Sequence, residues 1–402
     1  MKYLTLVPDG CGDRPVESLG GLTPLEAAGV ANINALAKIS EVGLVRTVPE
    51  GFAPGSEANV TLLGYGPDAY LTGRAPLEAA AMGIGMAEND MAFRVNLVTL
   101  SGDGGYDGLT IKDHSAGEIT DEEAEILMQY IDGELGGDGV RFYAGVGYRC
   151  LMISDRFGAD LRFTPPHDAK GRKTGPNLPQ GAGAETLADF QRRSYELLKN
   201  HPVNLKRVQN GQNPANSIWI WGQGKKLVLA PFGSKYGIKG SVVAAVNLVK
   251  GYGACAGLNV VKVPGADGTL HTNYGGKALA AIDEFKNGAE FVYLHVEAPD
   301  ECSHAGDAAG KIKSLELIDE KIMKPVAEYL SACGEPYRIL VVTDHYTLLS
   351  TRTHSFEPVP FVLYDSERKR APENCKAFSE SAGAMGRFFK SGSELADYFF
   401  RT

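Results

Sequence analysis

The segment FVYLHVEAPDECSHAGD, residues 291–307, decides the fold class because it joins an apolar strand to a turn rich in acidic residues and histidine. Its first six residues are typical of a buried strand. Further short apolar runs occur at 3–7, 217–221, 227–229, 258–263, 339–343 and 361–364. Segments with helical periodicity separate many of these runs, which predicts an α/β fold with a mainly parallel sheet and helices on both faces.

The helical pattern is clearest over residues 314–333. Apolar side chains recur there at steps of three and four residues, at Leu315, Ile318, Ile322, Val326 and Leu330. Such spacing places them on one face of a helix. Pro325 lies inside this segment and predicts a kink or an interruption.

Residues 105–184 differ from the rest of the chain. They are rich in Gly and Asp, contain short strand-like runs at 140–143 and 150–154, and include a polar stretch at 165–183. We therefore predict a smaller α+β domain, residues 105–184, inserted into a larger domain formed by residues 1–104 and 185–402.

Composition limits the classes of partner. The 402 residues carry a formal net charge of -9, which argues against nucleic acid. No apolar stretch reaches the ~18 residues of a membrane span. The six cysteines are scattered without a C-x-x-C pair, so we expect reduced thiols and a cytoplasmic protein.

Acidic and histidine residues follow several of the predicted strands. These candidates are Asp9, Asp300, His304, Asp344, His345 and His354. Ligands bind beyond the carboxyl ends of the strands in such sheets, so these side chains are expected to converge. Taken alone, Asp9 is equally well explained as a helix cap, and His295 and Asp307 are expected to be structural.

Ser56 lies in PEGFAPGSEANVTLLGYGP, where a Gly-containing loop leads into a helix. A helix N-terminus favours an anion, and a metal ion can activate a serine as a nucleophile. A plain helix cap is the alternative. Two divalent ions fit the whole set, one held by Asp9, Ser56, Asp344 and His345 and the other by Asp300, His304 and His354. Mixed Asp and His ligands suit Mn or Zn better than Mg alone.

The order Asp, Ser, Asp-x-x-x-His, Asp-His, His resembles that of the alkaline phosphatase superfamily. More narrowly, the chain resembles the archaeal-type, cofactor-independent (2,3-bisphosphoglycerate-independent) phosphoglycerate mutases. The motifs that carry this resemblance from end to end are DGCGDRP, TPLEAA, PGSEANVTLLGYGP, TGRAPLEAAAMGI, FRVNLVT, NPANSIW, DECSHAGD and TDHYTLLSTRTHSFEPVPF.

The resemblance implies an alkaline-phosphatase-like α/β domain with an inserted substrate-handling domain. It implies that Ser56 is phosphorylated during conversion of 3-phosphoglycerate to 2-phosphoglycerate, and that the two ligand sets each hold one ion. It further implies that the substrate is a small phosphorylated metabolite, whose anionic groups arginine side chains can bind. The candidates for substrate binding are Arg74, Arg94, His114 and Arg149.

Some positions depart from the mutases. The family's Asp-Arg-Arg-Ala-Gly-Arg run is DHSAGE at residues 113–118, and Trp221 replaces an arginine. These departures resemble a branch proposed to be an ATP-dependent homoserine kinase of threonine biosynthesis. An amino-acid substrate would need a partner for its ammonium, for which Glu118 or Asp168 is available. A phosphohydrolase would use the same metal ligands, but the large insert argues against it.

Overall fold

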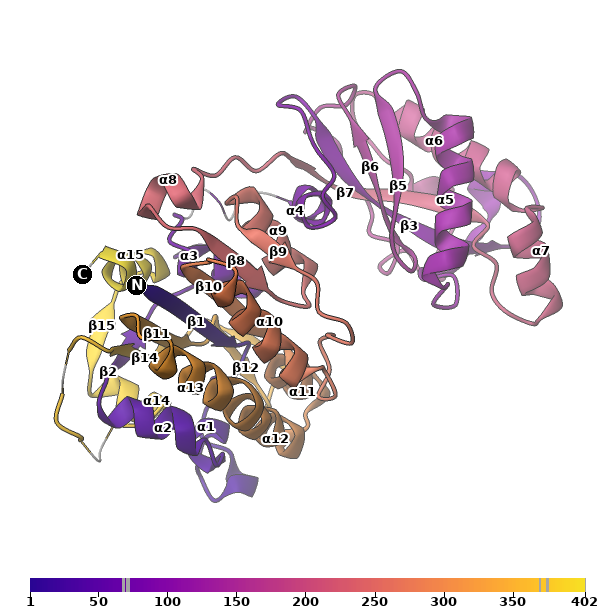
Figure 1. The fold of residues 1–402 in the computed structure, drawn as a ribbon. Coiled ribbons are helices and arrows are strands. Elements are labelled where there is room, and N and C mark those ends of the chain that lie inside the picture. Colours follow the sequence, from indigo (N-terminus) through magenta and orange to yellow (C-terminus); the bar gives the residue numbers. More distant parts are fainter. Residues whose placement is uncertain (67–68, 70–72, 369, 374–375, 402) are drawn as a thin grey trace. The chain divides into compact units, whose positions relative to one another are not determined.

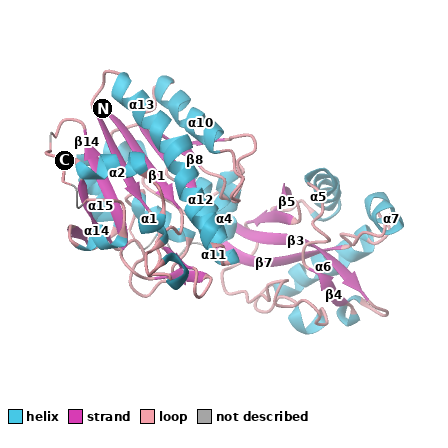
Figure 2. Cartoon of the chain, turned by 90° about the horizontal axis from the view of Figure 1, so that it is seen from below, coloured by secondary structure: helices cyan, strands magenta, loops and turns pink. Residues whose placement is uncertain are grey.

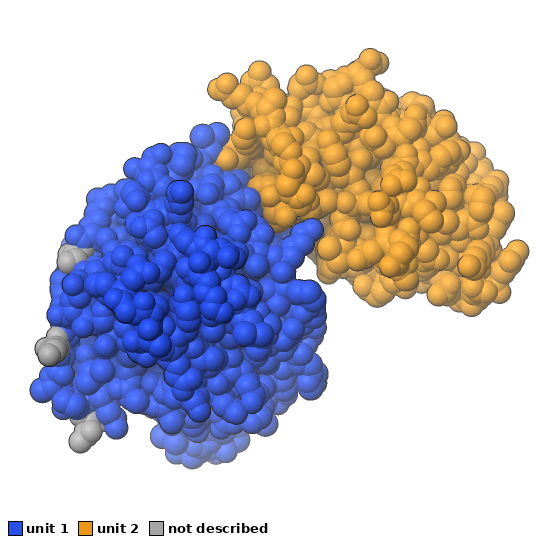
Figure 3. All heavy atoms as spheres, in the orientation of Figure 1, with its two compact units in different colours: residues 1–71, 228–402 blue, residues 72–227 orange. Residues whose placement is uncertain are grey.

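The computed structural model describes residues 1–66, 69, 73–368, 370–373 and 376–401. The chain divides into two compact units (Figure 3). Unit 1 consists of Met1–Leu71 and Val228–Thr402, and unit 2 of Thr72–Leu227. None of the described helices is both long and apolar enough to cross a membrane.

Unit 1 is built on an eight-stranded sheet of order β15-β2-β14-β11-β1-β10-β8-β9 (Figure 1). The strands are β1 (Lys2–Pro8), β2 (Glu41–Val45), β8 (Gly240–Val243), β9 (Asn259–Val261), β10 (Phe291–Val296), β11 (Tyr337–Val342), β14 (Val359–Asp365) and β15 (Arg387–Phe389). Only β14 runs antiparallel to its neighbours in this sheet. The predicted mainly parallel α/β sheet is confirmed.

Alternation along β1 divides the core of unit 1 between the two faces of the sheet. Leu4 and Leu6 pack into a cluster with apolar residues of the helices α2 (Ala31–Lys38), α10 (Tyr274–Lys286), α12 (Ala308–Ile318) and α13 (Lys324–Ala332). Tyr3 points to the opposite face and contacts Phe399 of α15 (Gly392–Arg401). Figure 2 shows the helices around this sheet.

The helices of unit 1 are α1 (Pro24–Ala27), α2 (Ala31–Lys38), α3 (Asn59–Leu62), α8 (Phe232–Tyr236), α9 (Asn247–Cys255), α10 (Tyr274–Lys286), α11 (Ala298–Ala305), α12 (Ala308–Ile318), α13 (Lys324–Ala332), α14 (Glu380–Ala384) and α15 (Gly392–Arg401). A short hairpin, β12 (Tyr346–Leu348) and β13 (Thr353–Ser355), follows β11. It carries one of the candidate ligands to the carboxyl ends of the strands.

Unit 2 contains a five-stranded antiparallel sheet. Its strands are β3 (Met91–Ser101), β4 (Thr110–Asp113), β5 (Val140–Val146), β6 (Arg149–Ser154) and β7 (Ser217–Lys225), and its helices are α4 (Arg74–Ala81), α5 (Asp121–Leu135), α6 (Ala184–Leu198) and α7 (Pro202–Gln209). Residues of α5 and α6 pack with those of β3, β5 and β7 in one apolar core.

The second unit is larger than the expected insert of residues 105–184. The difference arises because β3 is the long central strand of its sheet and β7 pairs with it. β3 is buried over nearly its whole length and the first four residues of β7 are buried, so in sequence they resemble strands of the main sheet. The apolar run at 227–229 forms no strand and lies where the chain passes between the units.

The predicted interruption of the helix at 314–333 is present as a π-helical turn, Asp319–Met323, between α12 and α13. Pro325 follows within the first turn of α13, where the missing N–H costs least. The wider turn presents the carboxylate of Asp319 to the start of α2. Asp319 accepts hydrogen bonds from the N–H groups of Asn32 and Ile33, at 3.0 and 2.7 Å.

We predict that Asp319→Ala lowers the free energy of unfolding by about 1–3 kcal/mol, because buried donors at the N-terminus of α2 lose a charged acceptor. Denaturant unfolding monitored by circular dichroism measures this difference. The neighbouring Glu320→Ala serves as the control, since Glu320 is exposed and forms a surface ion pair with Lys321. Equal stability of the two variants would contradict the capping role.

Candidate active site

The candidate residues converge at the carboxyl ends of the central strands, as the sequence predicts. Asp9 follows β1, and Asp344 and His345 follow β11. Asp300 and His304 lie four residues apart on α11, which begins directly after β10. The β12–β13 hairpin pairs Thr347 with His354 and so returns His354 to the same place.

Asp300, His304 and His354 form one compact group. The Nε2 atoms of His304 and His354 lie 3.2 and 3.4 Å from the two carboxylate oxygens of Asp300 and 3.0 Å from each other. Each imidazole directs its Nδ1 to a backbone carbonyl, that of Arg352 or Pro54. This arrangement holds both Nε2 atoms toward the centre, as in histidines that bind a metal.

Asp9, Asp344 and His345 form an adjoining group. His345 Nε2 lies 3.4 Å from Asp9 Oδ1 and 3.6 Å from Asp344 Oδ2. The ring centroids of His345 and His354 are 4.1 Å apart, so the two groups are contiguous. The backbone N–H of Gly10 and the side-chain amide of Asn59 donate to Asp344 at 3.2 and 2.6 Å and fix its carboxylate.

Gly10 is required by this geometry. Its φ of +59° is in the left-handed region, and a Cβ at this position would lie 2.6 Å from Asp300 Oδ1. The glycine after Asp9 therefore allows the backbone to pass against the carboxylate of the neighbouring ligand group.

Several polar atoms of these residues are buried without a hydrogen-bond partner. They are both carboxylate oxygens of Asp9, Nε2 of His345 and both ring nitrogens of His295. Unpaired buried acceptors are strongly destabilising unless a cation binds them. The oxygen and nitrogen atoms of this cluster therefore fit divalent cations. The residues that could hold one ion fall into overlapping groups, since Asp9 and Asp300 also lie together with His345.

The pKa values of the clustered acidic and histidine groups are shifted by burial and by their neighbours. Burial, followed by the charge of Asp344, raises the pKa of Asp9 well above its ordinary value. Burial also acts to raise the pKa of Asp300, but hydrogen bonds from His304 and His354 hold it below its usual range. The hydrogen bond to Asp300 raises the pKa of His304 to about 9. The cluster thus strongly attracts positive charge.

Ser56 begins a short 3-10 turn, Ser56–Ala58, that leads into α3. Its carbonyl accepts a hydrogen bond of 2.8 Å from Asn59, whose same amide group contacts Asp344. The preceding Gly55 lies against His354, since a Cβ at position 55 would be 3.5 Å from Nδ1 of that histidine. These contacts place the Ser56 backbone beside both ligand groups, and the side chain is partly exposed.

Three further residues of the cluster, Asn59, Thr347 and His295, were not predicted from the sequence as part of the site. Asn59 lies three residues after Ser56, and in a helix this spacing would have placed it on the same face as Ser56. Thr347 donates to Asp300 at 2.5 Å. His295, expected to be structural, has its Nε2 3.1 Å from Asp9 Oδ2 and joins Asp9 and Asp344 in a possible ligand group. Asp307 caps α12 by accepting the N–H of Gly310.

In unit 2, three of the four substrate-binding candidates line one small cavity of about 180 Å³. Its lining residues are Arg94, Asn96, His114, Tyr148, Arg149, His167 and Trp221. Arg74 lies nearby at the start of α4, where its charge influences Arg94, but it does not line the cavity. Neither Glu118 nor Asp168, the candidates for an ammonium partner, is among the lining residues.

Arg94 is held rigidly in this cavity. Its guanidinium pairs with Glu78 at 3.1 Å and stacks on the ring of Trp221 at 4.4 Å. Trp221 in turn donates from Nε1 to Asn96 at 2.9 Å. Arg149 lies over the ring of Tyr148. Aromatic contacts thus orient both guanidinium groups, of which that of Arg94 is also paired with Glu78.

A turn supports His114. The carboxylate of Asp113 accepts the N–H groups of Ser115 and Gly117 at 3.0 and 2.7 Å, and the amide of Asn213 at 2.9 Å. Burial opposes ionisation, but these hydrogen bonds lower the pKa of Asp113 to about 2. The DHSAG segment therefore forms a fixed turn that directs His114 from β4 toward the cavity.

Comparison with known proteins identifies the family. A chain of Methanosarcina mazei named 2,3-bisphosphoglycerate-independent phosphoglycerate mutase is 46% identical, over 96% of both chains. The protein described here belongs to the family of 2,3-bisphosphoglycerate-independent phosphoglycerate mutases. The family's sequence model matches residues 37–204. A relative from Geobacter sulfurreducens, named a probable mutase of the same kind, is 44% identical over 99% of both chains.

Solved structures share the fold. The PH0037 protein from Pyrococcus horikoshii superimposes with a TM-score of 0.80 at 27% identity, covering 99% of this chain and 96% of that one. The cofactor-independent phosphoglycerate mutase from Thermoplasma acidophilum gives a TM-score of 0.70 at 27% identity, over 99% of both chains. Both family membership and the α/β fold expected from the sequence are thereby confirmed.

We predict that divalent cations stabilise the metal-free protein, because they bind the buried unpaired atoms of the folded state only. At a free concentration of one hundred times Kd, the gain is about 2.7 kcal/mol per site. Thermal unfolding of chelator-treated protein with and without Mn²⁺ measures it. Asp9→Asn should lose the gain from the site that Asp9 helps to form, whereas the control His271→Gln, an exposed histidine, should retain the full gain. A Mn²⁺ response that is unchanged in Asp9→Asn would contradict the assignment.

Proposed function

We propose that this protein interconverts 3-phosphoglycerate and 2-phosphoglycerate through a phosphoserine at Ser56. The observation that carries the proposal is the cluster of buried, unpaired Asp and His atoms around the loop that contains Ser56. The reaction is inferred from the relatives, which are named phosphoglycerate mutases. The cluster offers ligands for the divalent cations that assist phosphoryl transfer.

The proposed reaction has two transfers. The Ser56 hydroxyl oxygen bonds to phosphorus as the bond from phosphorus to O3 of glycerate breaks, and the serine proton leaves while O3 gains a proton. The O2 hydroxyl then attacks the phosphoserine, the Ser56 oxygen leaves, and the proton movements reverse. Divalent cations, when bound, would favour the serine alkoxide and offset charge on the phosphoryl oxygens.

We assign the two ligand sets as first expected: Asp9, Ser56, Asp344 and His345 for one ion and Asp300, His304 and His354 for the other. The mixture of carboxylate and imidazole favours Mn²⁺ or Zn²⁺ over Mg²⁺. The scattered cysteines favour a cytoplasmic site of action.

Substrate binding is assigned to unit 2. The cations of Arg94, Arg149 and, when protonated, His114 suit the carboxylate or phosphate of a small phosphorylated metabolite. Arg74 is a further candidate at the edge of this group. Aromatic stacking of both lining arginines supports the assignment, since it limits the entropy lost when a ligand binds.

A homoserine kinase-type reaction with ATP is the second candidate. It is favoured by His114 and Trp221, which replace two arginines typical of the mutases. Against it, the cavity of unit 2 has no carboxylate among its lining residues to bind an ammonium group. The mutase reaction therefore remains the preferred proposal.

Phosphorus NMR distinguishes the two reactions in the metal-loaded enzyme. Incubation with 3-phosphoglycerate alone should yield 2-phosphoglycerate. Ser56→Ala should abolish that conversion, whereas the exposed control Ser331→Ala should retain it. Formation of O-phosphohomoserine from ATP and homoserine, without mutase turnover, would overturn the mutase proposal, and turnover in Ser56→Ala would overturn the serine's role.

We further predict that Arg149→Gln raises KM for 3-phosphoglycerate about 10- to 150-fold, because a charge-assisted contact of about 1.5–3 kcal/mol is lost. Initial rates over a range of substrate concentrations measure the effect. Arg141→Gln is the matched control, since Arg141 is exposed on β5 and pairs with Asp132. An unchanged KM in Arg149→Gln would remove this arginine from the substrate site.

A further inference from the structure

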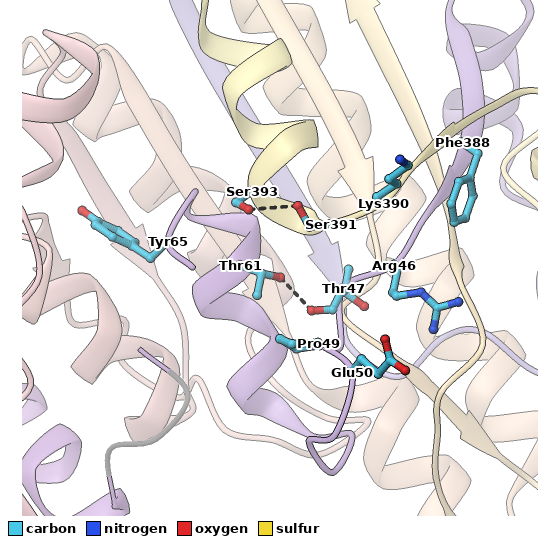
Figure 4. A pocket seen from close by; sticks show the side chains of 10 residues that line it. All are labelled: Arg46, Thr47, Pro49, Glu50, Thr61, Tyr65, Phe388, Lys390, Ser391 and Ser393. Carbon is cyan, nitrogen blue, oxygen red and sulfur yellow. Dashed lines mark hydrogen bonds between the residues drawn. The ribbon is translucent and has the colours of Figure 1, made fainter. Parts of the chain in front are cut away.

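Unit 1 contains a cavity of about 420 Å³. None of its lining residues belongs to the candidate active site. Figure 4 shows side chains from the segment after β2, from α3 and from the connection between β15 and α15 around it. Its volume is within the range of small-molecule sites in proteins. The cavity therefore has room for a ligand of its own.

Strand register places two cationic residues at this cavity. β15 runs parallel to β2, with Phe388 opposite Leu44 and Phe389 opposite Val45. The N–H of Arg46 then donates to the carbonyl of Phe389. Because side chains alternate along a strand, Arg46 and Lys390 follow on the face that carries Phe388. All three residues line the cavity.

Neither cation is neutralised by an ion pair within the described part of the chain. The nearby Arg387, in contrast, pairs with Glu41 at 3.3 Å. Arg46 and Lys390 directly follow these adjacent strands, and both charges favour an anion in the cavity that they line. The start of α15 is already capped, since Ser391 accepts the N–H of Glu394 and Glu394 accepts that of Lys390. The attraction for an anion thus comes from the two side chains.

Two further lining residues restrict the class of anion. Phe388 is 51% exposed, which leaves much of its ring free to stack on a planar group. Glu50 also lines the cavity and is in no ion pair among the described residues. A carboxylate in a nucleotide site commonly accepts hydrogen bonds from ribose hydroxyls. Phosphate, ribose and base each have a matching group.

We propose that this cavity binds a nucleoside monophosphate, with the phosphate between Arg46 and Lys390, the ribose hydroxyls on Glu50 and the base on Phe388. This cavity is separate from the candidate active site, but two of its lining residues are linked by hydrogen bonds to the backbone of Asp344. Thr47 Oγ1 donates to the backbone carbonyl of Asp344 at 2.5 Å, and Thr61 Oγ1 donates to the carbonyl of Thr47 at 2.9 Å. Both threonines line the cavity.

Isothermal titration calorimetry of the metal-loaded protein with AMP tests the cation pair. Arg46→Gln/Lys390→Gln should weaken AMP binding at least tenfold. The control Arg156→Gln/Lys239→Gln removes two exposed charges elsewhere and should bind AMP within twofold of the wild type. Melting temperatures check that each variant is folded. No AMP binding by the wild type, or equal affinity in Arg46→Gln/Lys390→Gln, would overturn the proposal.

Ribose 5-phosphate, which lacks the base, tests the ring contact. The wild type should bind AMP about tenfold more tightly than ribose 5-phosphate, as stacking on an aromatic ring predicts. Phe388→Ala should reduce this ratio to about one without changing the affinity for ribose 5-phosphate. Equal affinity of the wild type for the two compounds would overturn the assignment to a nucleoside monophosphate.

Discussion

Burial of acidic groups with too few hydrogen-bond donors is the constraint on which the centre of this protein depends. Asp9 and Asp344 are fully buried at the ends of adjacent strands, and Asp9 has no hydrogen bond to either oxygen among the described residues. Leaving such charge uncompensated costs several kcal/mol. Gly10, Asn59 and the hairpin that carries His354 hold the groups in this costly arrangement, which cation binding relieves.

The sheet order makes that arrangement possible. β1 lies between β10 and β11 and runs parallel to both, so the residues after all three strands meet at one edge. Parallel strands require long crossover connections, and these supply α11 and the ligands on it. The insertion of unit 2 leaves this order intact, because unit 2 forms its own antiparallel sheet and its own apolar core.

Sequence patterns predicted the parts that depend on local spacing. The apolar runs of β1, β10, β11 and β14 predicted the fold class, and the residues after the strands and the helical spacing of Asp300 and His304 predicted which side chains converge. The limits of unit 2 were not predictable in this way, because the buried strand β3 has the same apolar character as the main sheet. The grouping of Arg46 with Lys390 depends on pairing between distant strands, which no local pattern reveals.

The central claim is that Ser56 carries the phosphoryl group during the reaction. The most direct test is to mix the metal-loaded enzyme with 3-phosphoglycerate, quench the mixture in acid within the first turnovers, and locate phosphate in the peptides by mass spectrometry. The account predicts a phosphoserine at Ser56 that disappears when substrate is exhausted or removed. Continued formation of 2-phosphoglycerate with phosphate on another residue, or on none, would contradict it.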